Sequence, residues 1–468
     1  MEGNRQVKAV AIVFAAMSAF GAADVGWEFA NATHAPDKAE GRIVDGALEI
    51  SMPSKRSCAW WEREFSVAPG RGARFRAKAE VSLGAGEKAV YNDLMMFVTW
   101  YDPAKGSKKG VKFLQRDFMR YTDIGGARVF DDTFAVPGDC DTVRVELVAK
   151  WHRMDVRIRD IAVETVDAPR PRIVRCVVGN PYERPADYGA KFDWRKGGTE
   201  GAKAGWDDPV AVRTRRLVQI EDTLTNIFAK VERPDIILFA ETFADTGSPR
   251  WDLTSERIPG GPSFALASKY ARERRCNIAM NVHEVTDEGT FHNSTFIVDR
   301  EGRHVGTYRK VTLTSGEYMN GILPGDDFGV FDLDFGRVGC LTCWDNWFSE
   351  SAKYLRRKGA ELLLFPLAGC QMDHIDISFP SRSIDTGIPT LVAIRQKHLV
   401  SGIIDRDGQW IATTTDENGF AVADIDLNAR KRTFWLSVGP GEGDPYELYI
   451  DESRPELYER QDLRIPRR

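Results

Sequence analysis

The hydrophobic pattern changes its period partway along this 468-residue chain, and that change limits the folds open to it. In residues 24–167 apolar and polar side chains alternate, most clearly over residues 75–83 and 143–151. Alternation gives each strand one buried face and one solvated face. Turn residues such as Gly, Pro and Asp separate the runs, and no stretch with a helical period interrupts them. Residues 24–167 are therefore predicted to form an antiparallel β-sandwich.

The second part of the chain follows a different pattern. Residues 168–171, Ala-Pro-Arg-Pro, favour a stiff linker because proline suits neither a helix interior nor a central strand. From residue 172 onward, continuous apolar strands alternate with helical segments. The longest helix is expected over residues 209–231, with Asp208 as its N-cap, and Ser349 is the expected cap of a later helix. Residues 172–468 are thus predicted to form an α/β domain that ends in a C-terminal tail.

The first 23 residues have the layout of a secretory signal peptide. Arg5 and Lys8 precede an apolar run over residues 9–17, and small residues follow it up to Ala23. The run is shorter than the ~20 apolar residues that a membrane-spanning helix needs. We therefore expect an exported protein, periplasmic or extracellular after cleavage, with no membrane segment.

Charge balance and cysteine number exclude several classes of function. Lys and Arg total 64 and Asp and Glu total 69, so the net charge of −5 argues against nucleic-acid and polybasic membrane-surface partners. Seven cysteines in a chain of this length do not make a disulfide scaffold.

Three reactive residues fall at, or just past, the carboxyl ends of predicted strands. Glu241 and Cys343 are expected to close strands over residues 235–241 and 338–343, and Lys310 follows a third. Sites in α/β sheets gather at this edge. A carboxylate beside a thiol can take its proton as the sulfur attacks, and an ammonium stabilises the oxyanion that forms. The trio therefore predicts attack by a cysteine on an amide or nitrile carbon.

The segments around the trio also carry a family resemblance. They read Phe239-Ala240-Glu241-Thr242, Tyr308-Arg309-Lys310-Val311 and Gly339-Cys340-Leu341-Thr342-Cys343-Trp344-Asp345. Together they resemble the nitrilase, or carbon–nitrogen hydrolase, superfamily, over about residues 172–458. The resemblance implies a four-layer α-β-β-α sandwich and a thioester route without metal or organic cofactor. In that route Cys343 attacks, Glu241 relays protons and Lys310 supports the oxyanion.

The same resemblance implies supporting residues. Glu317 matches a second glutamate that many members place shortly after the lysine, and we expect it to orient Lys310 or the attacking water. A backbone N–H near Trp344 is expected to help hold the oxyanion. Asn293 is interpreted as a structural asparagine near the site, although residues 293–295 also match a glycosylation sequon.

The kind of carbon–nitrogen bond is less firmly indicated. Asp345 stands where true nitrilases carry a glutamate, and Phe348-Ser349-Glu350 is similar to the ending found in amidases. These residues favour a small amide substrate, while nitrile hydrolysis and N-acyl transfer by the same triad stay open.

Cys340 and Cys343 also form a C-x-x-C pair, which allows a redox dithiol, a disulfide or half of a metal site. In a strand, residues three apart face opposite sides, so Cys340 is expected to be core packing. No second C-x-x-C and no H-E-x-x-H motif completes a zinc site. We therefore expect no metal.

The predicted sandwich allows a function of another class. It resembles carbohydrate-binding jelly rolls in a general way, and its tryptophans either pack in the core or stack on sugar rings; they are Trp60, Trp61, Trp100 and Trp151. A glycan partner, and a non-catalytic glycan-binding protein that merely keeps the hydrolase fold, are the alternatives. The family resemblance also implies a homodimer or higher homo-oligomer.

Overall fold

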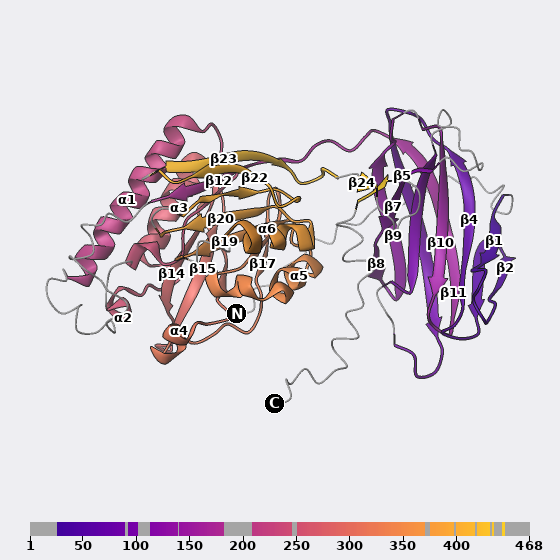
Figure 1. The fold of residues 1–468 in the computed structure, drawn as a ribbon, viewed down its shortest axis with the longest axis horizontal. Coiled ribbons are helices and arrows are strands. Elements are labelled where there is room, and N and C mark those ends of the chain that lie inside the picture. Colours follow the sequence, from indigo (N-terminus) through magenta and orange to yellow (C-terminus); the bar gives the residue numbers. More distant parts are fainter. Residues whose placement is uncertain are drawn as a thin grey trace, which may run out of the picture. The chain divides into compact units, whose positions relative to one another are not determined.

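The computed structural model describes residues 26–88, 92–101, 113–138, 140–181, 208–245, 250–369, 375–396, 399–416, 419–430, 433–434 and 442–444. The expected signal peptide and most of the expected C-terminal tail lie outside these ranges. The chain divides into two compact units, Met1–Ala168 and Pro169–Arg468, and the division falls in the segment predicted as a linker (Figure 1).

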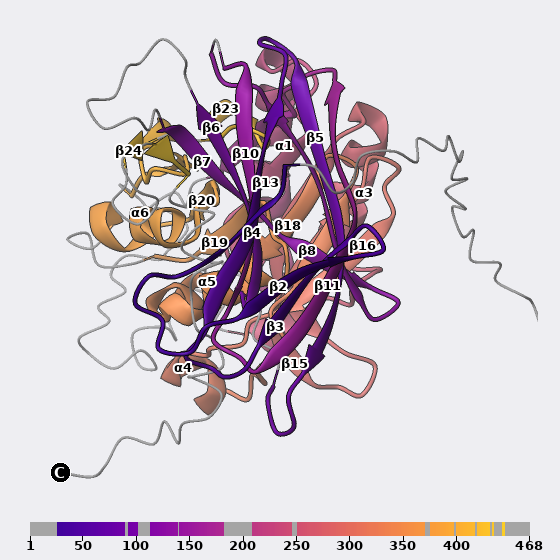
Figure 2. The same ribbon diagram turned by 90° about the vertical axis from the view of Figure 1, so that its right-hand side faces the viewer.

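Every described element of the first unit is a β-strand. Its strands are β1 (Glu28–Asn31), β2 (Glu40–Val44), β3 (Ala47–Met52), β4 (Cys58–Ser66), β5 (Gly72–Leu83), β6 (Leu94–Tyr101), β7 (Phe113–Met119), β8 (Tyr121–Ile124), β9 (Ala127–Ala135), β10 (Thr142–Lys150) and β11 (Met154–Val166). They pair antiparallel in two sheets, in the orders β1-β4-β10-β6-β7 and β2-β3-β11-β5-β9-β8 (Figure 2).

The alternating residues of the first unit meet in one apolar core between its two sheets. Phe75 of one sheet and Trp100 of the other are fully buried, with ring centroids 5.8 Å apart in an edge-to-face contact. Trp61 is also core, whereas Trp60 is half-buried and Trp151 is 37% exposed. Two of the four tryptophans singled out from the sequence are therefore packing residues.

Two further sheets form the framework of the second unit. Their strands are β12 (Ile173–Asn180), β13 (Ile236–Leu238), β14 (Asn277–Val285), β15 (Phe291–Val298), β16 (His304–Arg309), β17 (Val330–Leu333), β18 (Gly336–Cys340), β19 (Leu362–Leu367), β20 (Thr390–Ile394), β21 (Ser401–Ile404), β22 (Trp410–Thr414) and β23 (Gly419–Asp426), with a short pair β24 (Thr433–Phe434) and β25 (Glu442–Gly443). The sheet orders are β16-β15-β14-β13-β12-β23 and β17-β18-β19-β20-β21-β22.

Helices cover both sheets of the second unit, so that it has four layers (Figure 1). The helices are α1 (Pro209–Lys230), η3 (Phe243–Asp245), α2 (Trp251–Thr254), α3 (Pro262–Arg274), α4 (Ser315–Met319), η4 (Cys343–Trp347), α5 (Ser349–Arg357) and α6 (Ile375–Thr386). Apolar side chains of α1 and α3 pack on the first sheet, those of α5 and α6 pack on the second, and the inner faces of the sheets share a core. This is the α-β-β-α arrangement that the family resemblance implies.

Local sequence explains where α1 begins, but not where α5 begins. Asp208 caps α1 as expected, because its carboxylate accepts the backbone N–H of Val210 at 3.2 Å. The prediction that Ser349 caps a helix is wrong. Phe348 occupies the cap position of α5 without a side-chain hydrogen bond, and Ser349 is the first helical residue.

Two strands also end earlier than predicted. β13 ends at Leu238 and β18 at Cys340, so neither Glu241 nor Cys343 closes a strand. The chain turns instead, with positive φ angles of 43° at Thr242 and 47° at Cys343. The physical reason is local: side-chain acceptors, described below, hold these two turns in conformations that a strand does not allow.

None of the helices in the described part of the chain combines the length and hydropathy of a membrane-spanning segment.

Candidate active site

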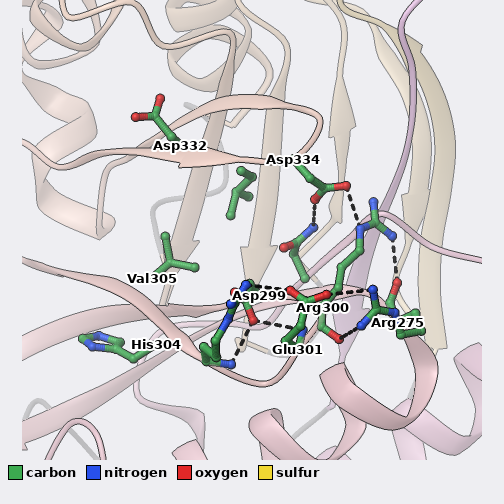
Figure 3. Close-up of a pocket in the computed structure, with 11 residues that line it drawn as sticks. Arg275, Asp299, Arg300, Glu301, His304, Val305, Asp332 and Asp334 are labelled. Carbon is green, nitrogen blue, oxygen red and sulfur yellow. Dashed lines mark hydrogen bonds and ion pairs between the residues drawn. The ribbon is translucent and has the colours of Figure 1, made fainter. Parts of the chain in front are cut away.

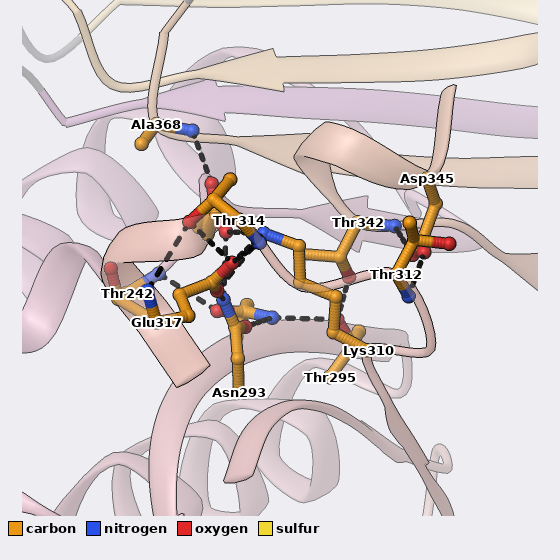
Figure 4. A network of polar contacts seen from close by, with 12 residues as sticks. Thr242, Asn293, Thr295, Lys310, Thr312, Thr314, Glu317, Thr342, Asp345 and Ala368 are labelled. Atoms are coloured by element: carbon orange, nitrogen blue, oxygen red, sulfur yellow. Dashed lines mark hydrogen bonds and ion pairs between the residues drawn. The ribbon is translucent and has the colours of Figure 1, made fainter. Parts of the chain in front are cut away.

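Lys310 is the centre of a buried polar network (Figure 4). It follows β16, and its side chain is 1% exposed. Its ammonium donates to Glu241 Oε1 at 3.1 Å and to Glu317 Oε1 and Oε2 at 3.0 and 2.9 Å. Glu241 comes from the turn after β13 and Glu317 from α4. Such partners are required, because burying an unpaired charge is costly.

Asn293 joins the two carboxylates. Its side-chain NH₂ donates to Glu241 Oε1 and to Glu317 Oε1, both at 2.7 Å. Its Oδ1 accepts from Asn281 Nδ2 at 2.9 Å, and Asn281 Oδ1 accepts the backbone N–H of Thr242 at 2.9 Å. The two buried amides thereby fix the position of Glu241 relative to Glu317 without adding charge.

Cys343 lies in a sharp turn that begins η4. The residue is half-buried, and its positive φ is uncommon for a side chain other than glycine. A capping box stabilises the turn, because the Asp345 carboxylate accepts the backbone N–H of Thr342 at 2.9 Å. Residues held in sparsely populated backbone conformations cluster at functional sites.

Asp345 also connects this turn to the lysine. Its Oδ2 accepts the hydroxyl of Tyr308 at 2.6 Å, and its Oδ1 accepts the backbone N–H of Thr312 at 2.8 Å. Tyr308 and Thr312 stand on either side of Lys310 in the sequence. One fully buried carboxylate therefore holds the segments that carry the sulfur and the ammonium.

A fourth strand end completes the surroundings of Glu241. The backbone N–H of Ala368, which follows β19, donates to Glu241 Oε2 at 2.6 Å. The Glu241 carboxylate and this N–H both affect the pKa of the Cys343 thiol, which places the sulfur close to them. Carboxylate, ammonium and sulfur thus share one small region of the second unit.

In this region the sulfur keeps its proton and the carboxylate beside it is ionised. Burial raises the pKa of the Cys343 thiol and the Glu241 carboxylate raises it further, which outweighs the opposing effect of Lys310. For Glu241, burial alone would raise the pKa, but Lys310, Arg395 and Asn293 together bring it below its usual range. The neighbouring acids hold the pKa of Lys310 above its ordinary value despite desolvation. The resting site therefore contains a thiol, a carboxylate and an ammonium.

Comparison with known proteins decides the family. Residues 210–433 match the family described as carbon-nitrogen hydrolase. The "Nitrilase" of Pyrococcus abyssi is 30% identical over 189 residues, which is 38% of this chain and 71% of that protein. The chain belongs to the carbon-nitrogen hydrolase family.

Other relatives differ in sequence identity and in the share of their length that this chain covers. The "Citrullinase" of Francisella tularensis is 28% identical over 260 residues, 52% of this chain and 89% of that protein. The "N-carbamoylputrescine amidase" of Solanum lycopersicum is 33% identical over 117 residues, which is 24% of this chain but only 38% of that relative. The solved amidase of a Nesterenkonia species is 18% identical, with a TM-score of 0.46 over 61% of this chain and 95% of that one.

Within this carbon-nitrogen hydrolase, the structure brings together most of the residues singled out from the sequence. Glu241, Lys310 and Cys343 converge, Asn293 donates to Glu241, and Glu317 accepts from Lys310. The side chain of Trp344 does not join this network. It is 40% exposed, and its ring lies 5.9 Å from that of Trp347.

As predicted, the two cysteines of the C-x-x-C pair lie in different surroundings. Cys340 is fully buried in the core between the sheets, whereas Cys343 lies in the site, and both are free thiols. Within the described residues, no group of three or more His, Cys, Asp or Glu side chains is arranged to hold a metal ion.

Sequence reasoning missed three contributors to the site. Asn281 gave no signal, because a lone asparagine in an apolar strand is indistinguishable from other buried polar residues. The linking role of Asp345 depends on contacts with a distant segment. Ala368 acts through its backbone, but its position directly after the strand predicted over residues 362–367 was a usable signal.

A separate cavity of about 540 Å³ lies just past the C-terminal end of β15, whereas Asn293 of the site is near the start of that strand (Figure 3). The residues that line this cavity do not include the triad. Arg300 in its wall is paired with Asp235 and, at 2.8 Å, with Asp334. Arg303 is paired with Asp299 at 2.8 Å. These arginines are paired with acids, and the cavity lining contains neither a cysteine nor a lysine, so it has no counterpart of the triad.

Proposed function

We propose that the protein is an exported amidase that hydrolyses a non-peptide carbon–nitrogen bond through a thioester on Cys343. The observation that carries the proposal is the buried hydrogen bond between Lys310 and Glu241, with the Cys343 thiol close enough for both groups to affect its pKa. An ionised carboxylate beside a protonated thiol can take its proton as the sulfur attacks the carbonyl carbon.

The first half-reaction forms the thioester. Cys343 Sγ attacks the amide carbon while its proton passes to Glu241, and the charge that develops on the carbonyl oxygen is stabilised by Lys310. We also assign a backbone N–H near Trp344 to this oxyanion. The carbon–nitrogen bond then breaks, and the proton on Glu241 passes to the leaving nitrogen, so that ammonia or an amine departs.

The second half-reaction regenerates the thiol. Water attacks the thioester carbon and gives its proton to Glu241, which the network of Asn293 and Lys310 keeps in place. The carbon–sulfur bond breaks, sulfur recovers the proton from Glu241, and a carboxylic acid leaves. Glu317 contributes by holding the ammonium of Lys310 with both of its oxygens.

The experiment that tests this proposal is an ammonia-release assay over simple amides, nitriles and N-carbamoyl compounds. The expected result is release from amides or N-carbamoyl compounds and none from nitriles. The name of the N-carbamoylputrescine amidase of Solanum lycopersicum supports including N-carbamoyl compounds. Release from nitriles alone, or transfer of the acyl group to an added amine in preference to water, would favour the corresponding alternative.

The first unit supports a second, separate proposal, that it binds a glycan. Trp151 is 37% exposed beside strands of a β-sandwich, and the Lys150 ammonium lies over its ring, 3.9 Å from the centroid, so a sugar would stack on the part of the indole that Lys150 does not cover. The full-length protein and its Trp151→Ala variant can be tested for retention on insoluble polysaccharides. Equal retention of both, or retention of neither, would contradict this role.

A further inference from the structure

One histidine shares a face with the proposed catalytic residues but has no part in the mechanism. His283 on β14 is paired directly with Asn293 on β15. Residues paired across an antiparallel ladder point to the same side of the sheet, with Cβ atoms about 5 Å apart. Asn293 contacts both Glu241 and Glu317. Asn293 therefore stands between the imidazole and the two carboxylates of the site.

The imidazole is held in place by an acid from the same turn as Glu241. Its Nδ1 is hydrogen-bonded to the carboxylate of Asp245, the last residue of η3. The side chain of His283 is 15% exposed and that of Asp245 is 5% exposed. An acid on Nδ1 fixes the neutral ring as the tautomer whose Nε2 accepts a hydrogen bond, and it turns Nε2 away from the acid.

Aromatic rings form an apolar wall beside this histidine. The ring of Trp251 lies 5.2 Å from that of His283 and 5.1 Å from that of Phe291. Phe291 lies two residues before Asn293 on β15, so both point to the same face. A polar atom beside an apolar wall is the usual composition of a site that orients a small molecule.

We propose that His283, Asp245 and Trp251 form a substrate-binding subsite. The subsite takes an amide whose acyl part ends in a hydrogen-bond donor, such as a hydroxyl, an N–H or an ammonium group. Nε2 of His283 accepts that donor, and Trp251 packs against the carbons between donor and carbonyl. Because His283 is so close to Asn293, the donor lies only a few carbons from the scissile bond. The inference rests on the proposed amidase function and names its substrate class.

The test compares two amides of the same shape, 4-hydroxybutanamide and pentanamide, which differ in a terminal hydroxyl or methyl group. Two readouts are taken on the full chain: the ratio of kcat/KM for ammonia release, and the ratio of concentrations that protect Cys343 from iodoacetamide. In both readouts we expect a preference of roughly tenfold for the hydroxy amide, as one hydrogen bond provides. The preference should appear mainly in KM.

Variants assign the preference to the subsite. His283→Phe, which keeps a ring but loses the acceptor, should bring both ratios close to one. His283→Gln, which retains a hydrogen-bonding end, should give intermediate ratios. The matched control is His304→Phe, at an exposed histidine on β16, and it should keep the wild-type ratios.

The inference is overturned if the wild type shows no preference, or if His283→Phe keeps it. A purely structural histidine would weaken both amides equally and leave the ratios unchanged, which also counts against the subsite. The protection assay needs no turnover. A protein that binds the hydroxy amide selectively but releases no ammonia would therefore disprove the amidase proposal while supporting the subsite.

Discussion

At the level of single residues, Cys343 and Cys340 are three positions apart and differ completely in surroundings. One is half-buried beside an ionised carboxylate, and the other is enclosed by apolar side chains between two sheets. Burial without a charged partner keeps a thiol protonated and inert, whereas a neighbouring base allows the sulfur to react. Two substitutions of the same kind should therefore have opposite consequences.

Cys343→Ala is expected to abolish turnover while leaving the fold intact, because only the nucleophile is lost. Cys340→Ala is expected to leave kcat largely unchanged and to lower stability by about 1–3 kcal/mol through the small cavity it creates. Ammonia release and urea unfolding measure the two effects. A matching loss of activity in both variants would revive the dithiol interpretation.

Glu256 gives a pH prediction away from the triad. Burial raises the pKa of this carboxyl from 4.5 to about 7, although it accepts two hydrogen bonds from Ser263 at the start of α3. Between these pH values the folded protein binds more protons than the unfolded chain, so stability falls as pH rises. At about 1.36 kcal/mol for each pKa unit, the loss is roughly 3 kcal/mol.

Glu256→Gln should remove that decline. In urea unfolding at pH 5 and pH 8, the variant should gain stability relative to wild type as pH increases. A constant difference between the two proteins at both pH values would show that Glu256 has an ordinary pKa.

At the level of elements, the site depends on how strand ends are joined. The Asp345 carboxylate holds η4 against the segment after β16, with one hydrogen bond to a side chain and two to the backbone. Fixing a reacting pair within a fraction of an ångström contributes strongly to rate, and a 1 Å misplacement can cost about 10²-fold.

Asp345→Asn is therefore expected to lower kcat by roughly 10²-fold with a much smaller change in KM. The matched variant Tyr308→Phe removes only one of the three hydrogen bonds and should cost less. Steady-state kinetics on any amide that is turned over measure both. Equal losses in the two variants, or a change in KM alone, would argue that Asp345 does not set the position of Cys343.

At the level of the whole molecule, α5 and α6 present apolar side chains to solvent. Tyr354 is 48% exposed, Ile377 67% and Ile384 41%. Exposed apolar residues gathered on neighbouring elements often mark a surface that a second subunit covers. We predict that the protein is a homodimer or higher homo-oligomer through this face, as its family resemblance implies.

Ile377→Glu tests that assembly, because a charge buried in an interface is costly. In sedimentation velocity the wild type should exceed the monomer mass and the variant should shift toward it, while Ile411→Glu on β22 serves as the control, since Ile411 is also exposed at 44%. A monomeric wild type would refute the assembly.

The sequence predicts the overall fold better than it predicts the ends of individual strands. The period of the hydrophobic residues was sufficient to predict an all-β unit followed by an α/β unit, because burial of one face imposes a period on every strand and helix. Glu241, Lys310 and Cys343 were selected with the help of the family resemblance of three short motifs, because as isolated residues they carry no signal. The ends of β13 and β18 were missed, because the turns at Thr242 and Cys343 depend on acceptors from Asn281 and from Asp345. Contacts of this kind arise only once distant segments have met.

The hydrogen bond from Ala368 to Glu241 has a consequence for evolution. The donor is a peptide N–H, so nineteen of the twenty genetically encoded residues supply it equally well, and proline alone removes it. Selection can therefore preserve this contact while the side chain at the position drifts freely. Among diverged relatives, we therefore expect proline to be absent at this position, while no particular residue is conserved there.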